Sequence, residues 1–297
     1  ELLATHPADA VLTESMFLGA MLLLSRPAAE RPPVINLGII PLGLRSRDTA
    51  PFALGIPPRP GSVGRARNAL LTWSTDRFVF GDLQRAAARQ VRDIVGAELR
   101  TPVMNYPSLA DAVVQFSVPE FEYPRTDVRT RVHFVGPVSL ADASSIPVPD
   151  WWGDLDADRP VVHVTQGTVA NADLNDLVLP TIDALADRDV LVVATTGGRE
   201  LPRRPLPANA RMAAYLPYDR LFPRTSVLVT NGGYGGVHYA LAHGVPVVAT
   251  GNTEDKAEVA ARVAWSGVGL RLKPTRTGIA PTRIAHAVDE ILGNGSY

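Results

Sequence analysis

From residue 161 onward, short apolar segments alternate with longer amphipathic ones. The short segments are rich in valine, and the longer ones repeat apolar residues at helical spacing. Strands that are apolar on both faces and alternate with helices form parallel sheets with helices on each side. The pattern therefore predicts an α/β fold with a doubly wound sheet. The predicted strands are residues 161–164, 190–194, 211–215, 227–230 and 245–249, and the predicted helices are residues 174–185, 237–242, 256–265 and 282–292.

The first half of the chain contains similar elements at less regular spacing. Residues 41–64 are rich in proline and glycine, which predicts a long surface loop. Residues 136–160 carry Gly136-Pro137, Ile146–Pro149 and a tryptophan pair, a composition typical of a linker. We therefore predict two domains, residues 1–149 and 150–297. Predicted strands of the first are residues 10–13, 34–40, 111–116 and 132–135, and its predicted helices are residues 17–24 and 70–95.

Composition narrows the classes of partner. The 29 basic and 30 acidic side chains nearly cancel, so the charge favours neither nucleic acid nor an anionic membrane as a partner. The longest apolar stretch, Met16–Leu24, is too short to span a bilayer. The chain has no cysteine, which excludes disulfides and thiolate chemistry and suits a cytoplasmic protein. We predict no metal site, because no carboxylates or histidines cluster at ligand spacing.

Polar and glycine-rich turns follow the strands of the predicted second domain. Ligands of parallel sheets bind outside the carboxyl ends of the strands. Asn231–Gly236 joins a strand to a helix, where glycine lets the backbone approach a ligand and free N–H groups face an anion. Thr165–Thr168 offers a second such turn, so the pair favours a diphosphate ligand. Alternatively, the glycines form a tight packing corner and Thr168 is a helix N-cap.

Two further positions at the same edge of the sheet carry suitable chemistry. Tyr215 ends a predicted strand, where an aromatic ring can stack on a nucleobase. The carboxylate of Asp255 follows another strand and can accept hydrogen bonds from sugar hydroxyls. The alternative interpretations are a core aromatic residue for Tyr215 and an N-cap for Asp255.

The order of these motifs resembles the donor-binding signature of the family 1, UDP-glycosyltransferase-like enzymes. The resemblance implies a GT-B fold, in which two Rossmann-like domains face each other across a cleft, with the N-terminal domain incomplete in this chain. It implies an inverting transfer of sugar from a UDP-sugar, or alternatively a dTDP-sugar, to a hydroxyl of a small apolar acceptor, without a cofactor. The motifs carry no information on oligomeric state. The matching segments are Tyr215–Tyr218, Asn231–Gly236, Ala240-Leu241, Gly244–Pro246, Asp255-Lys256 and Gly267–Gly269.

The resemblance also implies roles by matched position. Tyr215 takes the place of a base-stacking tryptophan, with Leu216 and Tyr218 flanking the base, and Asp255 and Lys256 lie at the sugar hydroxyls. Glu14 falls where the family has an aspartate that orients the catalytic histidine. The remaining donor-binding positions, at or beside the diphosphate, are Thr168, Asn231, Gly233, Tyr234, Gly235 and Gly236.

Three positions depart from the family pattern. Asn231 replaces a histidine beside the phosphates, and a neutral amide loses any charge-assisted bond. Tyr239 replaces a glutamate that holds the ribose hydroxyls, which weakens the preference for UDP over dTDP. Lys256 replaces a glutamine and adds a positive charge near the sugar or phosphate.

The family's general base is a histidine after the first strand of the N-terminal domain. None of the chain's 6 histidines lies in that context, and we interpret all of them as structural or surface residues. We therefore expect an incomplete record of a longer enzyme, whose catalytic histidine is absent here. Two other hypotheses remain open, a sugar-nucleotide epimerase on the same fold and a non-catalytic nucleotide-binding protein.

Overall fold

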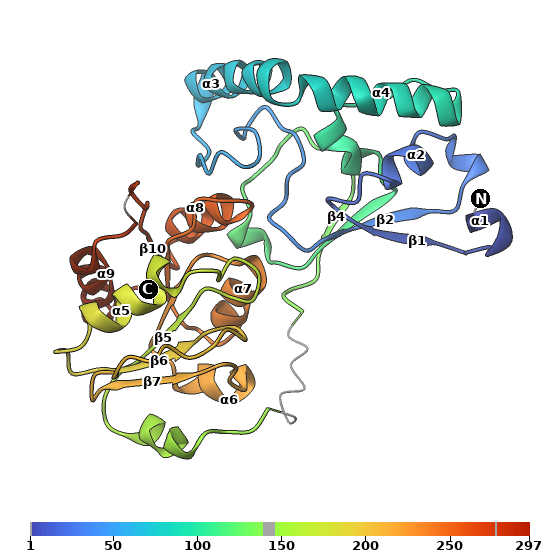
Figure 1. Cartoon of the computed structure of the whole chain (residues 1–297). Helices are drawn as coiled ribbons and strands as arrows, with labels where there is room; N and C mark the ends of the chain where they lie inside the picture. The colour runs from blue at the N-terminus through green and yellow to red at the C-terminus, as the bar shows by residue number, and fades with distance from the viewer. Residues whose placement is uncertain (1, 139–145, 277) are drawn as a thin grey trace. The chain divides into compact units, whose positions relative to one another are not determined.

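The computed structural model describes residues 2–138, 146–276 and 278–297 (Figure 1). The chain divides into two compact units, Glu1–Gly136 and Pro137–Tyr297. The predicted boundary, between residues 149 and 150, lies further along the predicted linker. The assignment of acceptor binding to the first part and donor binding to the second stays a prediction.

The first unit is built on a four-stranded parallel sheet, in the order β1-β2-β3-β4. Apolar side chains of α2, α4 and the 3₁₀ segment η3 form a buried cluster with Val34 of β2. All four predicted strands are confirmed. The elements are α1 (Leu2–Thr5), β1 (Val11–Glu14), α2 (Ala20–Leu24), η1 (Ala28–Glu30), β2 (Val34–Gly38), α3 (Gly61–Ser74), η2 (Thr75–Val79), α4 (Gly81–Val95), η3 (Val103–Leu109), β3 (Ala112–Gln115), η4 (Pro119–Phe121) and β4 (Val132–Phe134).

The helix predicted at residues 70–95 begins earlier and is interrupted. It comprises α3, the π-helical turn Thr75–Val79 and α4, which lie end to end in Figure 1. The predicted loop was therefore wrong for its last four positions, from Gly61 onward. Gly64 lies inside α3, at a position where only glycine fits, because an added Cβ would lie 1.8 Å from the carbonyl oxygen of Arg59. A glycine that signalled a loop serves here as a close packing contact.

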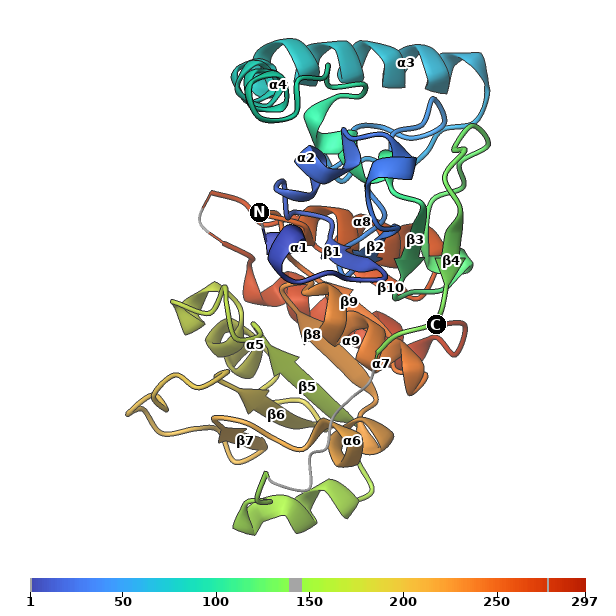
Figure 2. The same ribbon diagram turned by 90° about the vertical axis from the view of Figure 1, so that its right-hand side faces the viewer.

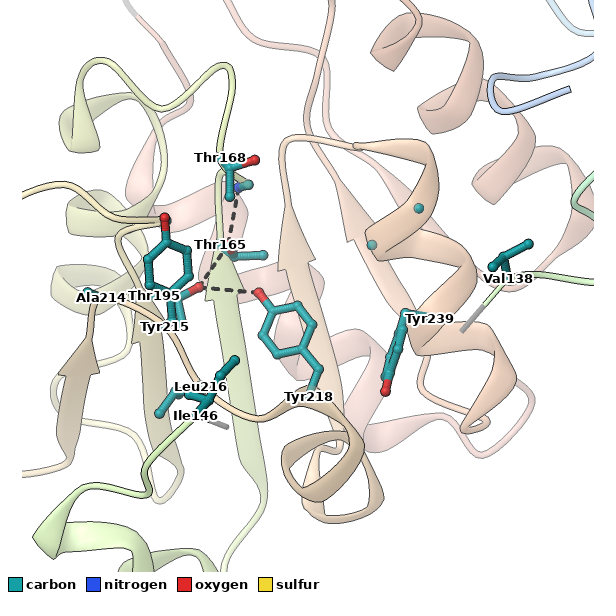
Figure 3. A pocket seen from close by; sticks show the side chains of 14 residues that line it. Val138, Ile146, Thr165, Thr168, Thr195, Ala214, Tyr215, Leu216, Tyr218 and Tyr239 are labelled. Carbon is teal, nitrogen blue, oxygen red and sulfur yellow. Dashed lines mark hydrogen bonds between the residues drawn. The ribbon is translucent and has the colours of Figure 1, made fainter. Parts of the chain in front are cut away.

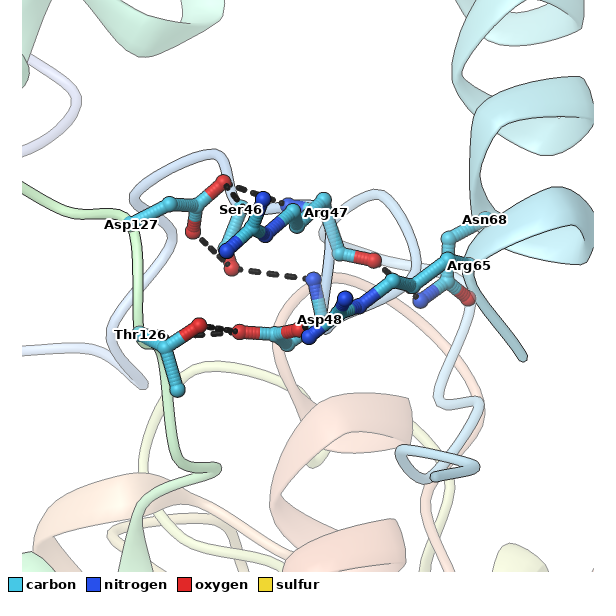
Figure 4. Close-up of polar contacts among 7 residues, drawn as sticks. All are labelled: Ser46, Arg47, Asp48, Arg65, Asn68, Thr126 and Asp127. Carbon is cyan, nitrogen blue, oxygen red and sulfur yellow. Dashed lines mark hydrogen bonds and ion pairs between the residues drawn. The ribbon is translucent and has the colours of Figure 1, made fainter. Parts of the chain in front are cut away.

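The loop before α3 is held by a network of polar contacts (Figure 4). The Ser46 hydroxyl donates to Asp127 over 2.5 Å. The carboxylate of Asp48 accepts from the backbone N–H and hydroxyl of Thr126, at 2.9 and 2.6 Å, and from Arg65 at 3.1 Å. The bonds from Thr126 hold the pKa of Asp48 below its usual value. Hydrogen bonds to carboxylates thus order a segment that lacks regular secondary structure.

The second unit contains a six-stranded parallel sheet in the order β10-β9-β8-β5-β6-β7. The five predicted strands are confirmed within two residues, and β10 was not predicted because its sequence, Gly269-Leu270-Arg271, has only one apolar side chain. The elements are η6 (Asp150–Asp156), β5 (Val161–Thr165), η7 (Leu174–Asp176), α5 (Val178–Ala184), β6 (Leu191–Thr195), β7 (Ala210–Ala213), α6 (Tyr218–Leu221), η8 (Phe222–Arg224), β8 (Val227–Thr230), α7 (Tyr234–Ala242), β9 (Val247–Ala249), α8 (Lys256–Ser266), β10 (Gly269–Arg271) and α9 (Pro281–Gly293).

Both faces of this sheet are buried, as the apolar strands predict. Val162 and Val164 belong to a cluster with residues of α5 and α9. Val161, one position earlier in the strand, packs instead with Trp152 and Leu155 of η6. Alternate side chains of one strand therefore anchor opposite layers.

The strand order places a switch point beside β5. The chain leaves β5 for β6 and β7 on one side, then returns to β8, β9 and β10 on the other (Figure 2). The loops that follow β5 and β8 diverge there, and such a point forms a crevice in doubly wound folds. None of the helices in the described ranges is both long and apolar enough to cross a bilayer.

Candidate functional site

A pocket of about 450 Å³ opens at the carboxyl ends of the strands of the second unit (Figure 3). The turns after β5, β6 and β7 and the start of α7 all contribute to it, so the predicted turns do meet at one edge. The lining residues are Val138, Ile146, Thr165, Gly167, Thr168, Thr195, Gly197, Ala214, Tyr215, Leu216, Tyr218, Gly235, Gly236 and Tyr239.

The glycines at the start of α7 leave open space. A Cβ added at Gly233, Gly235 or Gly236 would meet no atom within 4 Å. Among the glycines of the turn Asn231–Gly236, only Gly232 has a positive φ, at 88°, and it lies against Lys256. The packing-corner interpretation therefore fits Gly232 but not the glycines that follow it. The N–H groups of Gly235 and Gly236, at the positive dipole end of α7, lie beside a space that an anion can enter.

Hydroxyl groups form the opposite wall. The Thr195 hydroxyl donates to Thr165 over 2.9 Å, and Thr165 also accepts the N–H of Gly167 at 3.1 Å. The Thr195 hydroxyl lies 3.4 Å from that of Tyr218. The wall thus combines the ends of two adjacent strands with the first residue of α6.

A buried histidine orders this wall from behind. The Nδ1 atom of His163 lies 2.8 Å from the Val193 carbonyl oxygen, which can only accept, so Nδ1 carries the proton. The Nε2 atom, 3.2 Å from the Tyr218 hydroxyl, is then the acceptor. Burial lowers the pKa of His163 to about 4. A neutral imidazole therefore sets the direction of the Tyr218 hydroxyl.

This depressed pKa makes stability depend on pH. Between pH 6.5 and about 4 the unfolded chain binds a proton at His163 that the folded protein excludes. Stability therefore falls as pH is lowered through this window, by about 3 kcal/mol in total from this group. The free energy of unfolding, measured with urea at several pH values, should fall less steeply with decreasing pH for His163→Gln than for the wild type. Equal slopes would contradict the prediction, and His286→Gln, at an exposed position, is the control.

Tyr215 is exposed to 52% and lies after β7, which ends at Ala213. A Cβ added at Gly198 would lie 2.3 Å from the Tyr215 hydroxyl oxygen, so the ring rests over this glycine. The core-aromatic alternative is therefore wrong for Tyr215. Leu216, by contrast, is a core residue, which is buried and packs with Leu191 although it also lines the pocket.

Five predicted donor-binding residues do not line the pocket: Asn231, Gly233, Tyr234, Asp255 and Lys256. The Asn231 amide donates to the carbonyl oxygens of Gln166 and Ala170, at 2.6 and 3.2 Å. Tyr234 is buried, and its ring lies 4.1 Å from that of His238, centroid to centroid. Their roles in donor binding remain predictions.

The residues predicted at the sugar hydroxyls have contacts of their own. Lys256 is buried and its ammonium pairs with the carboxylate of Glu254. The added positive charge is therefore neutralised within the turn. Asp255 occupies the N-cap position of α8 without a side-chain capping bond, so it does not serve as the cap that the alternative interpretation required. Burial raises its pKa.

Glu14 ends β1 in the first unit. Its carboxylate accepts the N–H of Met16 at 2.7 Å, and its carbonyl accepts the Tyr106 hydroxyl at 2.9 Å. The side chain therefore stabilises its own turn, and the orienting role stays a prediction. No described histidine lines the pocket. Within the described ranges, no three metal-ligating side chains gather at one point.

Sequence reasoning missed several lining residues. Thr165, Thr195 and Gly197 lie in turns that the sequence placed at this edge, but we assigned them no donor contact, and Ala214 was not considered; all four lie directly at strand ends, where position alone could have identified them. Tyr239 lies four residues after Gly235 on α7, on the same helical face. In the sequence we identified Tyr239 only as a departure from the family pattern. Its four-residue spacing from Gly235 could have indicated that it lines the same pocket.

Comparison with known proteins places the chain in a family. The model of the erythromycin biosynthesis protein CIII-like C-terminal domain matches residues 179–297. The chain is 48% identical over 294 residues to 4'-demethylrebeccamycin synthase of Lentzea aerocolonigenes, covering 98% of this chain and 68% of that protein. The chain belongs to the family 1-like glycosyltransferases. This membership favours the glycosyltransferase hypothesis over the epimerase and the non-catalytic protein.

Other members extend the likeness. UDP-glycosyltransferase 2 of Phaeomoniella chlamydospora is 34% identical over 304 residues, covering 97% of this chain and 65% of that protein. The crystal structure of CalG4, the calicheamicin glycosyltransferase, matches with a TM-score of 0.69 at 22% identity, over 99% of this chain and 67% of that one. The fold is therefore GT-B, and this glycosyltransferase chain spans about two thirds of the length of these relatives.

Proposed function

We propose that this chain carries the donor site of an inverting glycosyltransferase, which moves a sugar from a nucleotide diphosphate to a hydroxyl of a small apolar acceptor. The observation that carries the proposal is the pocket in which an exposed Tyr215 and the open glycine turn of α7 face the same space. An aromatic ring suits a base, and a helix N-terminus suits a diphosphate.

In the proposed reaction, the acceptor oxygen attacks the anomeric carbon as the bond from that carbon to the diphosphate breaks. The hydroxyl proton passes to a general base, and the nucleoside diphosphate leaves with the bonding electrons. The N–H groups at Gly235 and Gly236 stabilise the charge that develops on the departing phosphate. The base is the family histidine, which we assign to none of the described residues.

Both pyrimidine nucleotides suit the pocket. The name of the Phaeomoniella relative supports UDP. Tyr239 lines the pocket where the family has a glutamate, and one phenol hydroxyl cannot bind a pair of ribose hydroxyls as a carboxylate does. A deoxyribose carrier such as dTDP is therefore the second candidate.

Thermal unfolding of the chain with UDP, dTDP, GDP and NAD tests the proposal. A ligand at 100 times its Kd stabilises the folded protein by about 2.7 kcal/mol, so UDP or dTDP should raise Tm by several degrees. GDP and NAD should not. If no nucleotide raises Tm, the donor site is contradicted. Radiolabelled sugar transfer to a phenolic acceptor then tests the chemistry separately.

The stacking role of Tyr215 makes a further prediction. Tyr215→Ala should weaken nucleotide binding about 5- to 150-fold, which corresponds to a base-stacking energy of about 1–3 kcal/mol. Tyr215→Phe keeps the ring and should bind within about threefold of wild type. Isothermal calorimetry measures both. Because Tyr215 is more than half exposed, Tm should stay unchanged in the absence of nucleotide. If Tyr215→Ala binds nucleotide as tightly as Tyr215→Phe, the ring of Tyr215 does not stack on the base.

A further inference from the structure

We infer that Asn231 is a positioning residue, which holds the loop Gln166–Ala170 in the conformation that presents Gly167 and Thr168 to the donor diphosphate. Asn231 acts through this loop and does not contact the phosphates itself. The inference rests on the proposed function, because it names the part of the donor that the loop serves.

The first support is the direction of the Asn231 amide. Its nitrogen lies 2.6 Å from the carbonyl oxygen of Gln166 and 3.2 Å from that of Ala170. Carbonyl oxygens only accept, so the NH₂ group must face them, and its two protons match the two acceptors. Both amide donors are therefore engaged within the protein.

The second support is what lies between the two bonds. Gln166 and Ala170 flank the segment Gly167–Val169, whose three residues are all exposed, Val169 to 81%. Gly167 and Thr168 of this segment line the pocket. One side chain thus fixes both ends of an exposed tip. The bonds also cross the switch point, because they join the end of β8 to the loop after β5. The loops that follow these two strands diverge there, and the sheet does not hold them together.

The third support is a matching bridge on the other side of the loop. The buried Asn171 amide donates to the carbonyl oxygens of Thr196 and Gly197, at 2.9 and 3.1 Å. A Cβ added at Gly197 would lie 2.0 Å from the Gly167 carbonyl oxygen, so the two turns are in direct contact. The loop is therefore attached to both neighbouring strand ends before any ligand binds, which lowers the entropy lost on binding.

The test compares Asn231→Ala with the wild type in two measurements. In the ligand-free protein, hydrogen exchange of the peptide spanning residues 166–171 should become about 10-fold faster, while exchange in β5 and β8 stays unchanged. The affinity for UDP or dTDP, whichever binds the wild type, should fall about 10-fold, as expected for two lost hydrogen bonds. The affinity for the matching nucleoside, which lacks phosphates, should change less than twofold.

Asn175→Ala is the matched control, because Asn175 is an exposed nearby asparagine whose side chain and backbone N–H donate to the carboxylate of Asp173. It should behave as the wild type in both measurements. If Asn231→Ala folds poorly, Asn231→Ser, which keeps one donor, should give an intermediate exchange rate.

Two results would overturn the inference. Unchanged exchange with weakened diphosphate binding would mean that Asn231 contacts the phosphates directly. Equal loss of nucleoside and diphosphate affinity would mean that the loop serves the base. If Asn231→Ala exchanges faster but the wild type binds no nucleotide, the proposed function is contradicted. The donor diphosphate is then contradicted as the ligand of this loop as well.

Discussion

Gly235→Asp is expected to abolish nucleotide binding, with at least a 100-fold rise in Kd, while the protein stays folded. A Cβ at Gly235 meets no atom within 4 Å, so the new side chain fits without displacing a neighbour. Its carboxylate would occupy the space proposed for the diphosphate and repel it at close range. In the first turn of α7 the same charge interacts favourably with the helix dipole, so Tm should hold or rise.

Two matched variants separate charge from volume. Gly235→Asn has nearly the shape of aspartate without the charge and should weaken binding by about 10-fold at most. Gly235→Ala should bind nearly as the wild type, and the lower entropy of its unfolded chain should raise stability by about 0.5–1 kcal/mol. Calorimetric titration with UDP and dTDP gives the affinities. Full binding by Gly235→Asp would show that the anion does not lie at the start of α7.

Arg262→Met is expected to lower the free energy of unfolding of the second unit by about 3–5 kcal/mol. Arg262 is fully buried in α8, and its Nη1 lies 2.6 Å from the carboxylate of Glu258, which is also buried. Methionine retains much of the arginine stem's volume but leaves the carboxylate without this ion pair. Urea unfolding at neutral pH, followed by the circular dichroism of the helices, measures the loss.

The double variant Glu258→Leu with Arg262→Met is the control for this interpretation. Replacing both charges with apolar side chains also removes the carboxylate that has lost its ion pair with Arg262, and should recover more than half of the loss. If the double variant is as unstable as the single one, the cost comes from other contacts of Arg262. A loss below about 1 kcal/mol in the single variant would contradict the importance of the pair.

The class of fold was accessible from the sequence because it depends on local patterns. Strands such as residues 227–230 are apolar on both faces wherever they lie in the sheet, and the helices between them repeat apolar residues every turn. Ligand-binding edges follow from the same pattern, so the turns at Thr165–Thr168 and Asn231–Gly236 were found without coordinates. The strand β10 was not found, because Gly269-Leu270-Arg271 lacks the run of apolar residues that marks the other strands of this sheet.

The tertiary structure alone decided which groups face the pocket and which face each other. The amide of Asn231 meets carbonyl oxygens 61 and 65 residues away in sequence, and the ammonium of Lys256 meets Glu254 instead of open solvent. The neutral state of His163 likewise depends on its burial against the rings of Tyr218 and Phe222, which lie far along the chain. A periodic pattern specifies that a segment is buried, but hydrogen-bond partners depend on which loops the strand order brings together, and that order results from packing over the whole sheet.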